Sequence, residues 1–220
     1  LLGVYRSTNG GESFANVPLL DSSGKMPNIL SLQGWYDNCL AVDADDERVL
    51  ILGGGGAGHF RTTNGGSTVA QTGVTDGVHV DAHQLVSKRY GSLKVTWTAN
   101  DGGLWLSTDG GVRWSDRNAG LATRQYYSVA LDPTRPDVMF AGSQDNGTDR
   151  KGDGTATFGH VIGGDGFEAA VNPDRPTVVY GSSQFTTLFR SKQDGRAGTF
   201  SYIAQPVAGQ AYSGSSGDAP

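Results

Sequence analysis

Four short polar clusters in this sequence carry side chains that could bind a ligand or catalyse a reaction. Three of the clusters pair a carboxylate with an amide or an imidazole, the fourth combines two carboxylates, and three of the four lie beside glycines. Convergent groups of this kind can hold a cation, hydrogen-bond a glycan or contact the basic groups of a peptide. The competing interpretation is that they satisfy backbone groups in glycine-rich turns. The clusters are Asp81 with His83, Asn100 with Asp101, Asp145 with Asn146, and Asp165 with Glu168.

A metal site is a second interpretation of one cluster. The segment "HVDAH" places Asp81 between His79 and His83. On a strand, residues i, i+2 and i+4 share one face, so the three side chains would point together. Two imidazoles and a carboxylate suit a transition metal, although the segment offers no further ligand. We expect no required cofactor. A structural calcium ion, held partly by backbone carbonyls, stays an open alternative.

Glycoside hydrolysis would need two carboxylates about 5 to 9.5 Å apart across a sugar cleft. Asp145 and Asp165 form the better candidate pair because they belong to neighbouring repeats. Glu168 is a third candidate. A sialidase is disfavoured, since the arginines mostly precede turns or lie in loops rather than forming a carboxylate-binding triad.

The elements that position these residues repeat along the chain. A turn of the type "STDGG" follows a short apolar segment at Ser7, Thr62, Ser107 and Ser191. A second series, "LAVDADDERVLILGG", "VALDPTRPDVMFAGS" and "AAVNPDRPTVVYGSS", places an Asp- or Asn-led turn between two β-rich segments. The turns recur at intervals of 55, 45 and 84 residues and the second series at 89 and 40. Most of these intervals are one or two periods of about 40 to 45 residues, the period of a four-stranded propeller blade.

The predicted fold is therefore all-β: a β-propeller of four-stranded antiparallel blades, forming a partial ring within one domain over 1–220. We predict blades at 35–78, 79–122, 123–164 and 165–204, a half-blade at 1–20 and an incomplete segment at 205–220. A solitary half-blade would leave strand edges unpaired, which natural sheets avoid. We therefore expect missing blades or other chains at both ends.

The repeated turn itself has a structural explanation. Its Asp or Asn can accept backbone N–H bonds, its glycine can supply a positive φ, and its aromatic residue can bury a ring between blades. The pattern Ser/Thr-x-Asp/Asn-x-Gly-x-x-aromatic resembles the Asp-box, or bacterial neuraminidase (BNR) repeat. We predict a structural role without chemistry for Ser7, Asn9, Gly11 and Phe14; Thr62, Asn64 and Gly66; and Ser107, Asp109, Gly111 and Trp114.

Longer motifs extend the resemblance over about residues 35–200. "HVDAHQL", "NDGGLWLSTDGGVRW", "GSQDNGT" and "GGDGFEAAVNPDRPTVVYGSSQ" resemble the large secreted bacterial Asp-box propellers. These are similar to sortilin-type and photosystem II assembly-factor-like propellers, and xyloglucan-cleaving glycoside hydrolases share the repeat. The sortilin-type resemblance implies capture of peptides or proteins.

Composition narrows the choice of partner. A net charge of −5 argues against nucleic acid as the main partner, and no apolar run is long enough to span a membrane. The loops are short and contain few acids. We therefore expect a non-catalytic propeller outside the cytoplasm, extracellular or periplasmic, that binds or scaffolds proteins or peptides. The alternative is a carbohydrate-active propeller, either a xyloglucanase-like glycoside hydrolase or a glycan-binding module.

Overall fold

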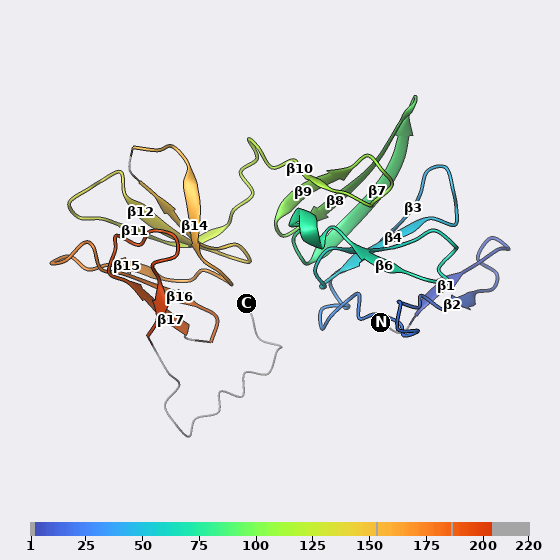
Figure 1. Ribbon diagram of the computed structural model, residues 1–220, viewed down its shortest axis with the longest axis horizontal. Coiled ribbons are helices and arrows are strands. Elements are labelled where there is room, and N and C mark those ends of the chain that lie inside the picture. Colours follow the sequence, from blue (N-terminus) through green and yellow to red (C-terminus); the bar gives the residue numbers. More distant parts are fainter. Residues whose placement is uncertain (1–2, 153, 186, 204–220) are drawn as a thin grey trace, which may run out of the picture. The chain divides into compact units, whose positions relative to one another are not determined.

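The fold is all-β and has the sheet organisation of a partial β-propeller. The computed structural model describes residues 3–152, 154–185 and 187–203. Four antiparallel sheets of four strands each follow one another along the chain, and a two-stranded hairpin precedes them (Figure 1). Within each sheet the strands are adjacent in chain order, which is the meander of a propeller blade. The predicted fold class is confirmed.

The strands are short, as the predicted repeat requires. The hairpin joins β1 (Val4–Arg6) to β2 (Ala15–Val17). The first sheet contains β3 (Asn38–Val42), β4 (Leu50–Gly54), β5 (His59–Thr62) and β6 (Ala70–Thr72), and the second contains β7 (Ala82–Tyr90), β8 (Leu93–Asn100), β9 (Gly103–Ser107) and β10 (Ser115–Asp116). The third contains β11 (Tyr126–Leu131), β12 (Met139–Ser143), β13 (Gly147–Lys151) and β14 (Phe158–Ile162). The fourth contains β15 (Ala169–Val171), β16 (Val179–Ser183), β17 (Thr187–Ser191) and β18 (Ser201–Tyr202).

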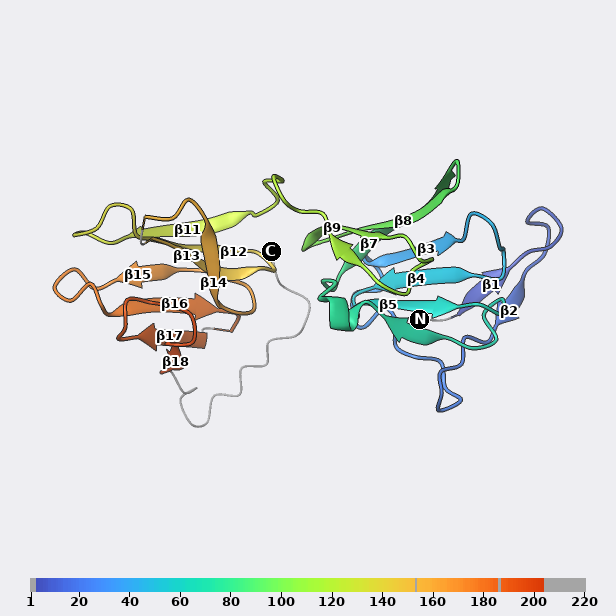
Figure 2. The ribbon, with the colours of Figure 1, turned by 45° about the horizontal axis from the view of Figure 1, so that its top comes forward.

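The chain divides into two compact units, Leu1–Thr123 and Arg124–Pro220. The first unit contains the hairpin and the first two sheets, and the second contains the other two (Figure 2). A single 3-10 helix, η1 (Val74–Asp76), occurs among the described residues. No helix in those residues is both long and apolar enough to span a membrane. The organisation of 1–220 as one propeller stays a prediction, and the predicted segment at 205–220 lies outside the described residues.

Packing in the first unit buries one face of the β3–β6 sheet against β7. Ala41, Ile51, Val78, Leu85, Trp105 and Trp114 form the core between these strands. Side chains alternate across a strand, so the neighbours of Ala41 point the other way. Leu40 and Val42 are 43% and 47% exposed on that opposite face. The second unit has its own buried cluster around Val138, Phe140 and Val179.

The four predicted hairpin turns share one hydrogen-bond pattern. In each turn the Ser or Thr hydroxyl accepts a bond from a glycine backbone N–H four residues later, at 2.8 Å in Ser7–Gly11 and Ser107–Gly111. The same distance is 3.0 Å at Thr62 and 3.1 Å at Ser191. Asn9, Asn64 and Asp109 each accept a backbone N–H four residues later at 3.0 Å. The turns therefore close on their own side chains.

The aromatic positions of the turns differ from the prediction in one case. Trp114 is 5% exposed and its ring lies 4.7 Å from the ring of buried His59. Phe14, at the equivalent position, is 63% exposed. The expectation that Phe14 buries its ring between blades is therefore wrong here. The physical reason is local: Trp114 packs between two four-stranded sheets, whereas the described part of the chain supplies only a two-stranded sheet around Phe14.

Candidate functional site

Three residues from two predicted clusters meet in the first unit. His83 Nε2 lies 2.5 Å from Asp101 Oδ1, and His83 Nδ1 lies 3.1 Å from Oδ1 of Asp37. Gln33 Nε2 donates to Asp81 Oδ1 at 2.9 Å and to Asp37 Oδ2 at 3.2 Å. We call these five residues, Gln33, Asp37, Asp81, His83 and Asp101, the His83 cluster. Sequence reasoning found three of them and missed Gln33 and Asp37.

Three separate elements position the cluster. Gln33 and Asp37 belong to the turns before β3, and the Asp37 N–H donates to the Gln33 carbonyl at 2.8 Å, which folds this segment on itself. His83 lies on β7, next to its first residue. Asp101 occupies the tight turn between β8 and β9. The antiparallel pairing of Ala82 with Asn100 brings the start of β7 beside that turn.

Asp37 is the deepest acid of the cluster. Its side chain is fully buried, and Oδ1 accepts no hydrogen bond from the described residues although it lies near His83. Desolvation, followed by the negative charge of Asp81, raises the pKa of Asp37 to about 6. The nearby imidazole of His83 acts in the opposite direction. Because Asp37 is buried, it can orient His83 but cannot touch a ligand.

The geometry of His83 limits its chemistry. Both ring nitrogens face carboxylates, so neither offers a free lone pair to a substrate or a metal. In a nucleophilic triad, one ring nitrogen faces an acid and the other faces the nucleophile. Here Asp101 occupies the place that a nucleophile would need. The arrangement fixes the orientation of a half-exposed imidazole between two acids.

The predicted metal site at His79, Asp81 and His83 rested on a shared strand face, and the structure does not form that face. β7 begins at Ala82, and Asp81 has a φ of 60° in the left-handed region. The alternation of an extended strand therefore does not apply from His79 to Asp81. His79 Nδ1 lies 3.1 Å from the carbonyl oxygen of Val80. Within residues 3–152, 154–185 and 187–203, no group of three or more His, Cys, Asp or Glu side chains is arranged to hold a metal ion.

Two aromatic residues that sequence reasoning did not single out lie beside the cluster. Trp35 is 83% exposed and Tyr36 is 62% exposed. Their ring centroids are 5.5 Å apart, and the Tyr36 ring meets His83 edge to face at 5.0 Å. Both residues precede Asp37 in "GWYDN". Adjacent aromatic residues before an acid, outside the apolar positions of a strand, are the signal that could have identified them.

Asn100 has a structural role. Its side chain is buried, donates to the His79 carbonyl at 3.1 Å and accepts from the Gly102 backbone N–H at 3.1 Å. These bonds tie the β8–β9 turn to the segment before β7. Asn100 therefore acts as a turn residue that satisfies backbone groups.

The second unit contains the other predicted residues. The Asp145 backbone N–H donates to Asp165 Oδ1 at 2.8 Å, so these two residues come together. Asn146 Nδ2 donates to the Gln144 carbonyl at 3.1 Å. Glu168 is exposed, and its backbone N–H donates to Ser182 Oγ at 3.0 Å. All three contacts involve a backbone group, as in a stabilised turn.

A further buried acid in the second unit escaped sequence reasoning. Asp149 has a side chain that is 2% exposed, and Tyr126 donates its hydroxyl to Asp149 Oδ2 at 2.9 Å. Arg124 Nε lies 3.4 Å from the same oxygen. Burial and this carboxylate raise the pKa of Tyr126 to about 12. The sequence "TDRK" around Asp149 gives no sign of burial, because charged residues usually mark an exposed strand.

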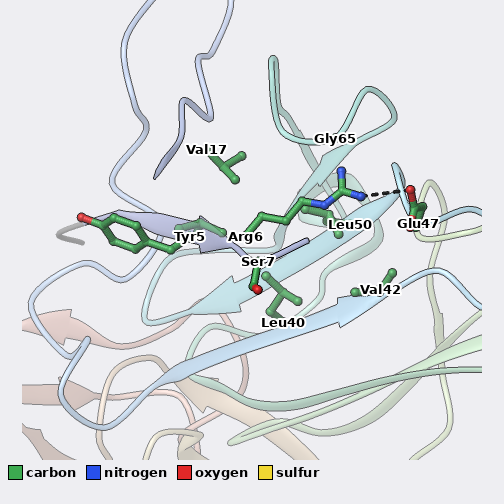
Figure 3. Close-up of a pocket in the computed structure, with 10 residues that line it drawn as sticks. Tyr5, Arg6, Ser7, Val17, Leu40, Val42, Glu47, Leu50 and Gly65 are labelled. Atoms are coloured by element: carbon green, nitrogen blue, oxygen red, sulfur yellow. Dashed lines mark hydrogen bonds and ion pairs between the residues drawn. The ribbon is translucent and has the colours of Figure 1, made fainter. Parts of the chain in front are cut away.

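The hairpin and the β3–β6 sheet enclose a groove of about 400 Å³ (Figure 3). β1 (Val4–Arg6) and the following Ser7 form one wall, while the exposed side chains of Leu40 and Val42 on β3 form the other. Arg6 reaches across to Glu47 with an ion pair of 2.9 Å. In the described part of the chain, β1 pairs only with β2. Within residues 3–152, 154–185 and 187–203, the other edge of β1 thus has no paired strand, and the apolar side chains of the groove lie beside it.

Comparisons with known proteins give structural similarities only. Neither a protein-family model nor a curated protein sequence matches the chain. A GH74 enzyme from Niastella koreensis is 18% identical, with a TM-score of 0.35, over 91% of this chain and 34% of that chain. A GH74 xyloglucanase from Xanthomonas campestris is 19% identical, with a TM-score of 0.31, over 75% and 29%.

A different kind of protein is similar at the same level. YCF48 from Cyanidioschyzon merolae is 16% identical, with a TM-score of 0.29, over 90% of this chain and 65% of that chain. A structure of YCF48 bound to D1 peptide gives 12% identity and a TM-score of 0.30, over 72% and 51%. The chain spans about a third of the length of the GH74 enzymes.

TM-scores this low do not support a fold assignment. The assignment of the fold therefore rests on the order and pairing of the strands in the sheets.

Proposed function

We propose that this chain is a non-catalytic, protein- or peptide-binding propeller module that acts outside the cytoplasm. One observation carries the proposal: in the described part of the chain no strand pairs with the second edge of β1, and the exposed aliphatic side chains of Leu40 and Val42 line the groove with β1 (Figure 3). An extended segment of a partner can add to such an edge. Its backbone bonds to the edge strand, and its alternate side chains fill the groove.

The repeat along the chain indicates which kind of strand would pair with the second edge of β1. The turn that joins β1 to β2 has the hydrogen bonds of the turns that join β5 to β6 and β9 to β10, the outer two strands of their sheets. By this equivalence β1 and β2 are the outer strands of a sheet. The next position beside β1 is that of an inner strand. In the complete sheets the strand at this position is β4 or its equivalent, and β4 and β12 read "LILGG" and "MFAGS", apolar with small residues at their ends.

The occupant we propose is therefore an extended, apolar strand of a partner polypeptide, antiparallel to β1. Leu40, Val42 and Leu50 supply the apolar floor, and the Arg6–Glu47 pair closes one end. An isolated strand is barely stable in water. A strand that pairs with β1 and buries its side chains in the groove is stabilised both by backbone hydrogen bonds and by the burial of apolar surface. The scaffolding role follows, because a strand shared between two chains joins them rigidly.

The test uses a synthetic peptide with the sequence of residues 126–143, which are the inner strands β11 and β12 of this chain. We expect it to bind and to slow amide hydrogen exchange at Val4–Arg6. Val42→Asp puts a charge on the groove floor, and we expect at least tenfold weaker binding, about 1.4 kcal/mol. Leu93→Asp, at a residue 52% exposed beside the β7–β8 turn, is the matched control and should bind normally. Equal binding by both variants, or unchanged exchange at Val4–Arg6, would refute strand addition.

The carbohydrate-active alternative has its own candidates, Asp145, Asp165 and Glu168. Its test is a panel of xyloglucan and glucan oligosaccharides incubated with the protein. If the wild type forms a product and Asp165→Asn does not, the chain is a glycoside hydrolase and the binding proposal is wrong. We expect no product, because Asp165 accepts a hydrogen bond from the Asp145 backbone N–H, as an acid that stabilises a turn does.

A further inference from the structure

The groove beside β1 adjoins a second hollow further along β3. The hollow has a volume of about 180 Å³, several times the roughly 30 Å³ that a water molecule occupies in the liquid. It is lined by Val4, Ile29, Leu30, Asn38, Cys39, Leu40, Leu52 and Gly53. Val4 and Leu40 line the groove as well. Residues i and i+2 of one strand share a face, so two side chains of an added strand can occupy one space each.

The turns fix the position of an added strand along β1. Ser7 and Thr62 are equivalent, because each hydroxyl accepts a backbone N–H from the glycine four residues later. Arg6 precedes Ser7 as Arg61 precedes Thr62. In the β3–β6 sheet Arg61 pairs with Ile51, the second residue of β4. We therefore expect the residue equivalent to Ile51 in an added strand to lie opposite Arg6.

A large side chain occupies this register position in all four complete sheets, and an arginine lies opposite it in three of them. The large residues are Ile51, Trp97, Phe140 and Tyr180, and the residues opposite them are Arg61, Leu106, Arg150 and Arg190. The Cζ atom of Arg150 lies 6.0 Å from the centroid of the Phe140 ring, the range of a cation–π contact. The side chain of Arg6 is 46% exposed and accessible to such a ring. This position therefore favours an aromatic residue.

Two residues further along the same strands, the side chain is small in every sheet. The residues are Gly53, Ala99, Gly142 and Ser182. A Cβ on Gly53 would lie only 3.1 Å from His59 Nδ1, so the imidazole takes the space there. In β1 the equivalent residue is Val4, which also lies three residues before the hydroxyl of its turn. Valine is smaller than histidine, and the 180 Å³ hollow lies beside it. The groove thus has room for a side chain that the chain's own strands do not carry.

We propose that the groove selects a partner strand with an aromatic residue opposite Arg6 and an aliphatic residue, about the size of leucine, opposite Val4. The aromatic ring would lie over Leu40 and Val42 beside the guanidinium group, and the aliphatic side chain would fill the hollow. The inference rests on the proposed strand addition and names the side chains that the partner presents. A second copy of this chain fits less well, because its own strands would leave the hollow unfilled.

The test compares variants of the 126–143 peptide, in which Phe140 and Gly142 take the two register positions. All changes are made in the peptide, so they do not alter folding of the protein. Gly142→Leu should bind at least fivefold more tightly than the unaltered peptide, because its side chain buries apolar surface in the hollow. Phe140→Ala should bind at least fivefold more weakly, because the ring over the groove floor is lost. Ala141→Leu points to the opposite face of the strand and is the matched control, with unchanged affinity.

A photocrosslink locates the aromatic position directly. A peptide with benzoylphenylalanine in place of Phe140 is irradiated in complex with the protein, and the linked residues are identified by mass spectrometry. We expect crosslinks to Leu40, Val42 or Leu50, which line the groove. Crosslinks confined to other segments would overturn the predicted register.

The affinities separate this inference from strand addition itself. If the unaltered peptide slows exchange at Val4–Arg6 but either Gly142→Leu or Phe140→Ala binds with the same affinity, strand addition stands and the proposed selectivity is wrong. An equal gain for Ala141→Leu and Gly142→Leu also refutes the selectivity, since added apolar surface alone would then explain both. If none of the peptides slows exchange at Val4–Arg6, both proposals are wrong.

Discussion

Individual residues in this chain take their roles from burial more than from type. Asp37 and Asp101 both contact His83, yet one is fully buried and the other partly exposed. The first can only orient the imidazole, and the second can meet a ligand. Asp149 and Asp165 differ in the same way in the second unit, since Asp149 is buried against Tyr126. A carboxylate in the sequence thus does not reveal which of these two roles it has.

Asp37 should make stability depend on pH. Its folded pKa of about 6 lies above the value of 3.8 for a free side chain, so the folded state holds the proton more tightly. The favourable contribution is complete below about pH 4 and is lost as the pH rises through 6. The groups that face it are Asp81, His83 and Asp101. We expect Asp37→Asn to gain stability relative to wild type between pH 4 and pH 7, by at most about 3 kcal/mol.

Urea unfolding of both proteins at several pH values measures this difference. His59 titrates in the opposite sense, since burial lowers its pKa from 6.5 to about 4 and its contribution is lost as the pH falls. His59 is present in both proteins, so its effect cancels in the difference. A difference that stays constant from pH 4 to pH 7 would contradict the assignment to Asp37.

At the scale of elements, the hairpin turns are the most regular feature of the chain. Each one closes through the same hydroxyl and a glycine with positive φ, and the values at Gly11, Gly66 and Gly111 are 94°, 89° and 88°. The surroundings differ, however. A Cβ on Gly11 would meet nothing within 4 Å, whereas a Cβ on Gly111 would lie 2.5 Å from Ile51 Cδ1. The glycine of the turn therefore faces open space in the β1–β2 hairpin and packs against a core side chain in the β7–β10 sheet.

These two glycines allow strain and packing to be separated. Gly11→Ala should lower the free energy of unfolding by about 1 kcal/mol, because alanine resists the positive φ. Gly111→Ala adds an overlap with the buried Ile51 side chain and should cost about 2 to 4 kcal/mol. Urea denaturation of the two variants measures both values. Equal losses would mean that the core around Ile51 adjusts without cost.

At the scale of the whole molecule, each compact unit has its own buried core. Ile51 belongs to the cluster of the first unit, and Phe140 belongs to the cluster of the second. Both side chains are almost completely buried. The proposed binding feature, the groove beside β1, is in the first unit. Stability of that unit is therefore the quantity on which the proposed function depends.

Separate cores predict separate responses to core mutations. Ile51→Ala should remove about 2 to 5 kcal/mol and Phe140→Ala about 3 to 5 kcal/mol. Native-state hydrogen exchange should show lost protection mainly within residues 3–123 for Ile51→Ala and mainly within 124–203 for Phe140→Ala. Loss of protection across both units in either variant would show that the chain unfolds as one body.

The sequence by itself determined the class of fold, because that information is local. The repeat of short β-rich segments, Asp-led turns and glycines predicts four-stranded antiparallel sheets, and the sheets are present. The backbone bonds accepted by the Asp or Asn of the turns are also local, spanning four residues, so the turn motif was enough to predict them. The sequence placed Asp81 and His83 in one cluster and Asp101 in another, and their contact through His83 was found only in the structure.

Only the tertiary structure decided which of these residues form a site. Gln33 and Asp37 lie more than 40 residues from Asp81 and His83 in the sequence, and packing of the segment before β3 against β7 brings them together. The left-handed backbone at Asp81 removed the expected metal-binding face. Exposure of Phe14, Trp35 and Leu40 likewise depends on what covers each surface. Local pattern specifies strands and turns, whereas burial and convergence arise from contacts between distant segments, which no short stretch of sequence encodes.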